Sequence, residues 1–276
     1  MSNHAWRTDE PPRGVPLRIW WHVTEVTAQW DGANVARRGR AGVAGADYTL
    51  AEGVRGVSKL GPYDLDTIVT GDARELAQAL PDESIDLIFT DPVYWQIDDY
   101  AWLAELAARV LKPGGNVLAY AGHVQQIECA ARMMQFLTPR PMLTTWMSPP
   151  YPRLFGLKMH VNYSFVLWFS KGKGTPRQWV VSELGQAYQA KNTGHVWGKN
   201  FGAVAYYVEK FTDVAGTILD PFAGGATVPA VCKMLGRHYL AFEIDPATAE
   251  RARERVHNTQ PPLFVPEPEQ AAMFGD

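Results

Sequence analysis

The residues best suited to chemistry stand at the ends of apolar runs, and one such run leads into a glycine turn. Residues 218–227 read Ile-Leu-Asp-Pro-Phe-Ala-Gly-Gly-Ala-Thr, a strand pattern followed by a turn and a helix pattern. A glycine turn lets a ligand approach the backbone, and the helix after it offers unpaired amides. The next apolar run ends in Glu243, whose carboxylate can accept hydrogen bonds from ribose hydroxyls. The series predicts a site for a ligand that carries a ribose.

Two earlier apolar runs also end in acids. Residues 67–70 lead to Asp72, and residues 85–90 lead to Asp91. Open α/β sheets bind ligands at the carboxyl edge of their strands, so both acids are candidate site residues. Asp72 also suits the N-cap of a helix that starts near Ala73, and the two roles do not exclude each other.

These residues need a sheet to position them, and the sequence predicts one. From Gly61 onward, short apolar runs alternate with helix-period segments, which is typical of a parallel sheet with helices on both faces. We expect an N-terminal extension over 1–60, partly flexible, a catalytic domain over 61–258 and a flexible proline-rich tail over 259–276. Strands are expected at 67–70, 85–90, 116–121, 142–147, 163–169, 217–219 and 239–243, and helices at 73–80, 100–111, 124–136, 201–212, 226–235 and 246–256.

Residues 91–94, Asp-Pro-Val-Tyr, resemble the catalytic tetrapeptide (Asp/Asn/Ser)-Pro-Pro-(Tyr/Phe/Trp) of amino-group DNA methyltransferases, and residues 220–225 resemble the cofactor motif of these enzymes. The catalytic motif comes first here, which is the circularly permuted order of the beta class. The resemblance covers roughly residues 65–258. It implies a Rossmann-like, seven-stranded methyltransferase sheet, S-adenosylmethionine as cofactor and DNA as substrate.

The resemblance also implies roles for single residues. The Asp91 carboxylate and the Pro92 carbonyl would accept the two amino protons of a flipped-out base, with Val93 in the same loop and Tyr94 stacked on the ring. Such acceptors draw the amino nitrogen toward tetrahedral geometry, so that it can attack the sulfonium methyl in line. No metal and no covalent enzyme intermediate are implied. The cofactor-binding residues would be Asp72 at the adenine, Glu243 at the ribose, and Asp220, Pro221, Phe222, Gly224, Gly225 and Lys199.

The chain departs from the family pattern at two points. The second proline of the tetrapeptide is Val93, and the proline usual after the lysine of the cofactor-closing segment is absent after Lys199. Proline would fix φ and pre-shape the catalytic loop, whereas valine is restricted at its side chain. Reduced or lost activity is therefore an open alternative. The rival from another class is a catalytically silent relative that binds DNA or the cofactor.

The target base is read from the first motif position. Aspartate there favours adenine, and methylation of cytosine at its exocyclic nitrogen is the alternative. A second match, Ser-Pro-Pro-Tyr at 148–151, spells the cytosine type in full, but it follows no strand beside an acid-tipped neighbour, so we assign it to a loop. A nicotinamide dehydrogenase is disfavoured because Gly224-Gly225-Ala226 lacks the Gly-x-Gly-x-x-Gly spacing.

Few residues are available to form a region that recognises the DNA sequence. The gap at about 172–196, where the beta class usually carries its recognition region, is short, so a large reading module is not expected. Trp146, Tyr151 and Arg153 are candidates to hold a flipped base, with an aromatic core patch as the equal alternative. The segment Gln270–Phe274 resembles the bacterial sliding-clamp-binding peptide, with a disordered end as the alternative.

Composition limits the remaining classes. The net charge is −3, so contacts to nucleic acid must come from local clusters of Lys and Arg. Cys129 and Cys232 are the only cysteines, which excludes a disulfide framework or a Cys-based zinc site. Without a signal pattern or an apolar run long enough to span a membrane, we expect a cytoplasmic protein of a bacterium or phage-infected cell, in restriction-modification or as a solitary enzyme. RNA as substrate and a homodimer stay open.

Overall fold

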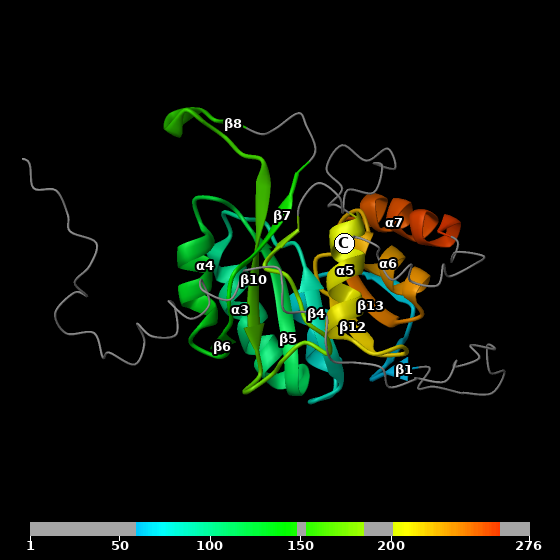
Figure 1. Cartoon of the computed structure of the whole chain (residues 1–276). Helices are drawn as coiled ribbons and strands as arrows, with labels where there is room; N and C mark the ends of the chain where they lie inside the picture. Colours follow the sequence, from blue (N-terminus) through cyan, green and yellow to red (C-terminus); the bar gives the residue numbers. More distant parts are fainter. Residues whose placement is uncertain (1–58, 148–152, 185–200, 260–276) are drawn as a thin grey trace, which may run out of the picture. The chain divides into compact units, whose positions relative to one another are not determined.

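The computed structural model describes residues 59–147, 153–184 and 201–259 of the chain (Figure 1). Contacts divide the chain into two units, Met1–Val54 and Arg55–Asp276, and the described residues belong to the second. The predicted extension over 1–60 and tail over 259–276 lie almost wholly outside the described residues. The predicted domain bounds therefore stay predictions.

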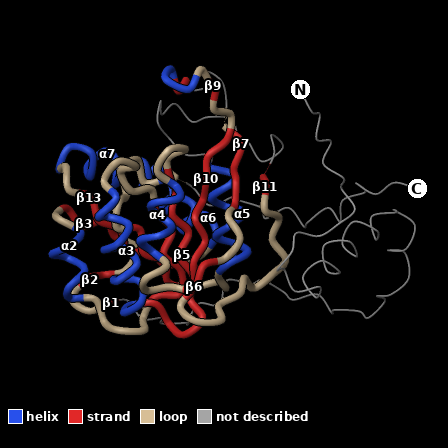
Figure 2. The backbone as a smooth tube through the Cα atoms, turned by 90° about the vertical axis from the view of Figure 1, so that its left-hand side faces the viewer, coloured by secondary structure: helices blue, strands red, loops and turns tan. Residues whose placement is uncertain are grey.

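A mixed sheet forms the centre of the second unit (Figure 2). Along the sheet the strands are β11 (Glu183–Leu184), β7 (Leu143–Trp146), β10 (Tyr163–Ser170), β5 (Leu111–Ala121), β4 (Ile85–Thr90), β12 (Thr217–Asp220), β13 (His238–Glu243) and β3 (Thr67–Thr70), and β6 (Thr138–Pro139) pairs with β10 alone. The strands from β5 to β3 run parallel, whereas β10 is antiparallel to β5 and β7 is antiparallel to β10.

All seven predicted strand segments are strands, but the sheet formed by the described residues has nine strands, so the predicted count of seven is wrong. The additional strands, β6 and β11, have two residues each, which is too short for a periodic pattern to show. β5 also begins at Leu111, five residues before its predicted start. The Pro-Gly-Gly sequence at 113–115 interrupts the apolar run there and hides the strand.

Helices cover both faces of the sheet, as predicted. On one face lie α2 (Ala73–Leu76) with the 3-10 turn η1 (Ala77–Ala79), α3 (Ile97–Val110) and α4 (Gln126–Met133); on the other lie α5 (Phe201–Phe211), α6 (Thr227–Leu235) and α7 (Pro246–Asn258). Two predicted helices were too long: residues 73–80 are a short helix and a 3-10 turn, and the helix predicted at 124–136 spans Gln126–Met133. The fold class, an α/β sheet with helices on both faces, is confirmed.

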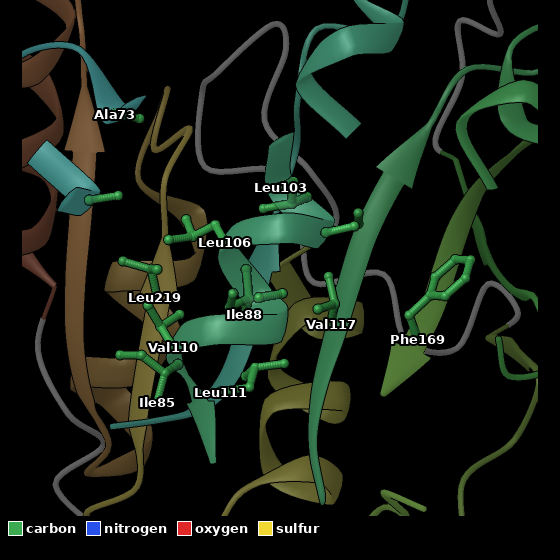
Figure 3. Packing of buried hydrophobic residues seen from close by; sticks show 14 of the residues in the cluster. Ala73, Ile85, Ile88, Leu103, Leu106, Val110, Leu111, Val117, Phe169 and Leu219 are labelled. Carbon is green, nitrogen blue, oxygen red and sulfur yellow. The ribbon is translucent and has the colours of Figure 1, made fainter. Parts of the chain in front are cut away.

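The central strands are buried on both sides because both faces are covered, which explains their continuous apolar runs. On β5, Val117 belongs to the core under α3 and α4, and Leu118 to the core under α5 and α6. Figure 3 shows the first core, where Ile88 and Val117 pack under Leu103 of α3, all three fully buried. The rigid middle of the sheet therefore holds the ends of β4 and β12 in place.

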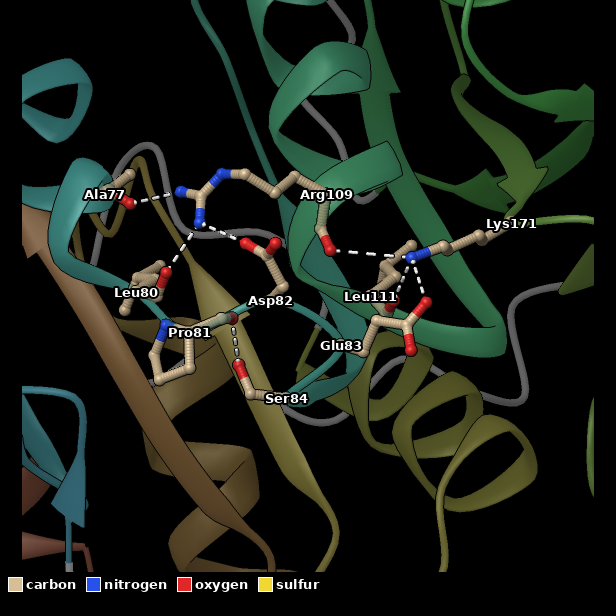
Figure 4. A network of polar contacts seen from close by, with 9 residues as sticks. All are labelled: Ala77, Leu80, Pro81, Asp82, Glu83, Ser84, Arg109, Leu111 and Lys171. Carbon is tan, nitrogen blue, oxygen red and sulfur yellow. Dashed lines mark hydrogen bonds and ion pairs between the residues drawn. The ribbon is translucent and has the colours of Figure 1, made fainter.

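Two cations, Arg109 and Lys171, form hydrogen bonds and an ion pair at the edge of the sheet where the parallel strands begin, which we call the amino edge (Figure 4). Arg109 donates to the carbonyls of Leu80 at 2.6 Å and Ala77 at 2.7 Å. Lys171 donates to the Leu111 carbonyl at 2.9 Å and pairs with Glu83 at 3.0 Å. These bonds tie α3 and the end of β10 to the loop before β4, and leave the opposite, carboxyl edge for a ligand.

Two small hairpins complete the described part: β1 (Lys59–Leu60) with β2 (Tyr63–Asp64), and β8 (Arg153–Leu154) with β9 (Met159–His160) around the 3-10 turn η2 (Phe155–Leu157). Among the described helices, none has the length and apolar character needed to cross a membrane.

Candidate active site

The carboxyl ends of β4 and β12 meet at the centre of the sheet. The two strands are parallel neighbours, with Leu219 beside Ile88. Thr90, the last residue of β4, donates its hydroxyl proton to Oδ1 of Asp220, the last residue of β12, at 2.7 Å. Both side chains are buried. This bond joins the strand that leads to the predicted catalytic loop to the strand that leads to the predicted cofactor turn.

The predicted catalytic loop follows β4 directly and ends where α3 begins at Ile97. Pro92 is buried, Val93 is exposed, and the Val93 carbonyl accepts a hydrogen bond from the Gln96 amide at 3.0 Å. Burial, together with the charge of Asp91 and a hydrogen bond to it, raises the pKa of Tyr94. In this conformation the Tyr94 hydroxyl is thus bound by the carboxylate that we expect to act on the base.

The glycine turn links β12 to α6. Gly224 and Ala226 both have φ in the left-handed region, at +47° and +54°. The Gly224 amide donates to Oε2 of Glu243 at 2.8 Å, and the Asp245 amide donates to Oε1 of the same carboxylate at 2.9 Å. Glu243 is therefore held at the end of β13, facing the turn, with lone pairs left for further donors.

A pocket of about 340 Å³ opens between the loop and the turn. It brings together Asp91, the residue after β4, and Asp220, the last residue of β12, which are far apart in the sequence. Of the predicted site residues, those that line it are Asp91, Asp220, Phe222, Gly224 and Gly225. Those described but not among its lining residues are Asp72, Pro92, Val93, Tyr94, Pro221 and Glu243.

Asp220 has an unusual environment for a carboxyl group. It is 3% exposed, and burial is the main cause that raises its pKa to about 7. Hydrogen bonds from Thr90 and from the Phe222 amide act in the opposite direction, while the charges of Asp91 and Glu243 raise the pKa further. The pocket floor therefore changes its charge near neutral pH.

Asp72, a predicted cofactor residue, is not among the residues that line the pocket. Asp72 caps α2, with its Oδ1 accepting from the Arg74 amide at 2.8 Å, so the N-cap interpretation is confirmed. Its predicted contact with the cofactor's adenine stays a prediction. Lys199 lies outside the described residues, as does the Ser-Pro-Pro-Tyr segment at 148–151.

Several pocket residues were not identified from the sequence. Thr248 and Arg251 lie three residues apart on α7 and line the pocket, with the Arg251 guanidinium donating to the Thr248 hydroxyl at 2.8 Å. Arg255, one turn further, donates to the Gly225 carbonyl and to the Thr227 hydroxyl at 3.3 Å. The spacing of Thr248, Arg251 and Arg255 places them on one face of a helix and can be read from the sequence. Which face of this polar helix packs against the glycine turn depends on the tertiary fold.

The three residues predicted to hold a flipped base are Trp146, Tyr151 and Arg153. Trp146 ends β7 opposite Tyr163, and its neighbourhood holds a group of rings in which His123 lies 5.0 Å from Tyr163 and 5.1 Å from Phe165. Arg153 starts the β8–β9 hairpin. Tyr151 lies outside the described residues. Both the base-holding role and the aromatic-patch interpretation of Trp146 stay open.

Comparison with known proteins agrees with this geometry. The DNA methylase family, of the N6/N4 type, matches residues 85–254, more than half of the chain and including both motifs. A general methyltransferase domain matches residues 33–119. The chain belongs to the DNA methylase family. The predicted family is thereby confirmed.

Relatives of this methylase share both sequence and fold. It is 25% identical over 258 residues to the type II methyltransferase M.HinfI of Haemophilus influenzae, covering 71% of this chain and 70% of the relative. The crystal structure of the M1.HpyAVI–S-adenosylmethionine complex superposes with a TM-score of 0.58 at 20% identity, covering 69% of this methylase and 98% of that chain. The cytosine-N4-specific PvuII DNA methyltransferase gives 0.60 at 18%, covering 68% and 85%. These structures support the methyltransferase fold; the circularly permuted order stays a prediction.

The pocket suits the cofactor that the first of those structures contains. Its volume lies in the range of roughly 300–1,000 Å³ that is common for small-molecule sites. An amino-acid end and a nucleoside end need separate polar partners, and the pocket offers Asp220 on its floor and the α7 side chains Thr248 and Arg251 on its wall. The turn places Gly224 and Gly225 against the space, where the backbone can be approached closely.

Proposed function

We propose that this chain transfers a methyl group from S-adenosylmethionine to the exocyclic amino group of adenine in DNA. The observation that supports it most directly is that Asp91 and the glycine turn line one pocket, joined beneath by the Thr90–Asp220 hydrogen bond. Donor and acceptor groups of a transfer reaction must meet in such a space.

The cofactor would be held by Asp220, Phe222, Gly224 and Gly225 at the turn, with Glu243 and Asp72 toward its nucleoside. S-adenosylmethionine supplies an electrophilic methyl group on a sulfonium centre. Lys199 is proposed to act in a segment that closes over this site. None of these assignments requires a metal, and the described residues contain no group of three or more His, Cys, Asp or Glu side chains that could hold one.

In this proposal, the loop after β4 binds the target base and orients its amino group. Asp91 accepts a hydrogen bond from one amino N–H and the Pro92 carbonyl accepts one from the other, which localises the lone pair on nitrogen. Attack on the methyl group breaks its bond to sulfur and releases S-adenosylhomocysteine, and the methylated amino group then loses one proton. Because the Tyr94 hydroxyl is bound to Asp91 in this conformation, base binding exchanges that donor for the amino group and frees Tyr94 to stack. Val93 is exposed at this loop and would contact the DNA or the base from outside.

Adenine as the target is supported by the aspartate at position 91, because in the family that the tetrapeptide resembles aspartate at this position favours adenine. The relatives do not decide between the bases. Docking of residues 270–274 to a sliding clamp and formation of a homodimer are further proposals from the sequence, and the first lies outside the described residues.

The test is transfer of labelled methyl from S-adenosylmethionine to mixed, unmethylated bacterial DNA, followed by mass spectrometry of the nucleosides. We expect label in methyladenosine, which Asp91→Ala abolishes. Asp98→Ala, an exposed acid in the first turn of α3, is the matched control and should keep the activity. Label in methylcytidine would replace adenine by cytosine as target; cofactor binding without any transfer to DNA would contradict the enzyme proposal.

A further inference from the structure

The β8–β9 hairpin stands at the same edge of the sheet as the proposed catalytic loop. It is inserted between β7 and β10, where Trp146 faces Tyr163 across antiparallel strands. β10 is antiparallel to β5, with Phe165 opposite Ala121, so β10 begins at the carboxyl end of β5. β5 neighbours β4, which leads into Asp91. In Figures 1 and 2 the hairpin projects beyond the ends of β7 and β10, away from the helical layers.

The hairpin exposes both basic and apolar side chains. Arg153, Lys158 and His160 are exposed, and so is Leu157, with 66% of its surface accessible. Among the strands that the structure describes, its two strands pair only with each other, Arg153 opposite His160. Lys158 has a φ of +50°, which is unusual for a residue with a side chain. The exposed side chains of this turn are therefore accessible to a partner.

Charge singles out this region of an otherwise acidic chain. Between residues 129 and 182 there is no Asp or Glu, although the chain has a net charge of −3. The same stretch holds these cations: Arg132, Arg140, Arg153, Lys158, Lys171, Lys173 and Arg177. Contact with a polyanion requires local positive charge. Of these cations, Arg153 and Lys158 lie on the hairpin, whereas Lys171 and Lys173 follow β10 at the opposite edge of the sheet.

Most of these cations already have partners within the protein. Lys171 pairs with Glu83 and Arg177 with Asp213. Arg132 pairs with Glu128, and Arg140 donates to Ser170. Within the described ranges, Arg153, Lys158 and Lys173 have no such ion pair, and the first two lie on a hairpin whose side chains are mostly exposed. Their charges are thus available to a ligand.

We propose that the β8–β9 hairpin is a DNA-contacting arm, in which Arg153 and Lys158 bind backbone phosphates of the duplex that carries the target base and Leu157 faces its groove. The inference rests on the proposed function, because the arm is directed to the same DNA. It places a contact element in the β7–β10 connection, apart from the short insert predicted at about 172–196. Lysine and arginine on phosphates position a protein on DNA, whereas an apolar tip contacts the groove.

The test measures binding of the full chain to a fluorescently labelled mixed-sequence duplex over a salt series. The variant Arg153→Ala/Lys158→Ala removes two phosphate contacts, so the slope of log K against log salt should become less steep by about two. Lys173→Ala is the matched control. It is exposed but follows β10, at the opposite edge of the sheet, where Ser170 pairs with Asn116, and it should keep the wild-type slope.

The outcomes separate this proposal from the proposed function. A double variant with the wild-type slope, while the wild type methylates DNA, would overturn the arm and leave the enzyme standing. Binding that depends on Arg153 and Lys158 without any methyl transfer would leave the arm and overturn the enzyme. If duplex RNA or anionic lipid vesicles bind through these two residues and duplex DNA does not, DNA is the wrong partner. Unchanged affinity of both variants for S-adenosylhomocysteine shows that they are folded.

Discussion

Thr90 and Asp220 share a buried hydrogen bond of 2.7 Å that connects the two halves of the proposed active site. The residue after Thr90 is Asp91, and the segment after Asp220 is the glycine turn. A substitution of either side chain should therefore disturb both the catalytic loop after β4 and the pocket residue Asp220.

We expect Thr90→Val to weaken cofactor binding and methyl transfer together. Valine keeps the shape but removes the donor, which leaves Asp220 with the Phe222 amide at 3.3 Å as its donor among the described groups. Leaving a buried acceptor short of a partner costs about 1–3 kcal/mol of stability. Chemical denaturation and calorimetry with S-adenosylhomocysteine measure the two effects. Thr90→Ser, which restores the hydroxyl, should recover most of both; equal losses in the serine variant would contradict the hydrogen-bond argument.

Burial of Asp220 makes stability depend on pH in a defined direction. Its pKa rises from 3.8 to about 7 in the folded protein, so the folded state binds more protons than the unfolded state between these values. The stability linked to the neutral form is complete below pH 3.8 and is lost as pH rises toward 7. A shift of this size corresponds to roughly 4 kcal/mol at most.

Asp220→Asn isolates this effect, because asparagine cannot ionise while all other carboxyl groups remain. We expect the free energy of unfolding of the wild type to fall relative to that of the variant as pH increases from 4.5 to 8, measured by urea denaturation. A difference between the two proteins that stays constant with pH would show that Asp220 is ionised in the folded state throughout.

The sequence was sufficient for the seven longer strands of the sheet, for the helices apart from some of their ends, and for both motifs. All the long strands showed apolar runs, and the acids at their ends lie at the carboxyl edge because parallel strands share that edge. Thr90 was overlooked because a threonine at the end of an apolar strand gives no sign of its partner 130 residues away. Arg251 and Arg255 were overlooked for the same reason, since α7 is rich in charges and only packing shows which of them face the turn.

The hairpin could not be foreseen either. Its strands have two residues each, and the connection between β7 and β10 contains prolines that favour a loop. Absence of acidic residues from 129 to 182 was a usable signal, but only the sheet topology shows that the hairpin within this stretch lies at the edge where Asp91 lies.

Gly122 should be essential for the position of Tyr94. A Cβ atom added at Gly122 would lie 2.9 Å from the Cβ of Tyr94 and 2.6 Å from Oε1 of Gln125, closer than real contacts allow. We expect Gly122→Ala to displace Tyr94 and lower methyl transfer at least tenfold, a loss of about 1.4 kcal/mol in transition-state stabilisation. Affinity for S-adenosylhomocysteine should change little, because Gly122 does not line the pocket.

Asp98→Ala is the control here too, because Asp98 is an exposed acid in the first turn of α3. Methyl transfer by this variant should stay within a factor of about two of the wild type, a change below 0.5 kcal/mol. Full activity of Gly122→Ala would mean that the loop has room to shift and that the contact with Tyr94 does not position it.

Val93→Pro restores the family's tetrapeptide and tests whether valine limits the enzyme. Among the described hydrogen bonds, the Val93 carbonyl accepts from Gln96 and its amide donates to none, so proline removes no bond seen in the structure. Fixing φ reduces the freedom of the unfolded chain and of the loop, which is worth roughly 0.4–1 kcal/mol where the backbone is compatible. We expect a severalfold higher kcat on DNA with unchanged affinity for S-adenosylhomocysteine. A lower kcat with a lower melting temperature would show that the loop has adopted a backbone conformation that proline cannot take, and that Val93 is a specific adaptation of this chain.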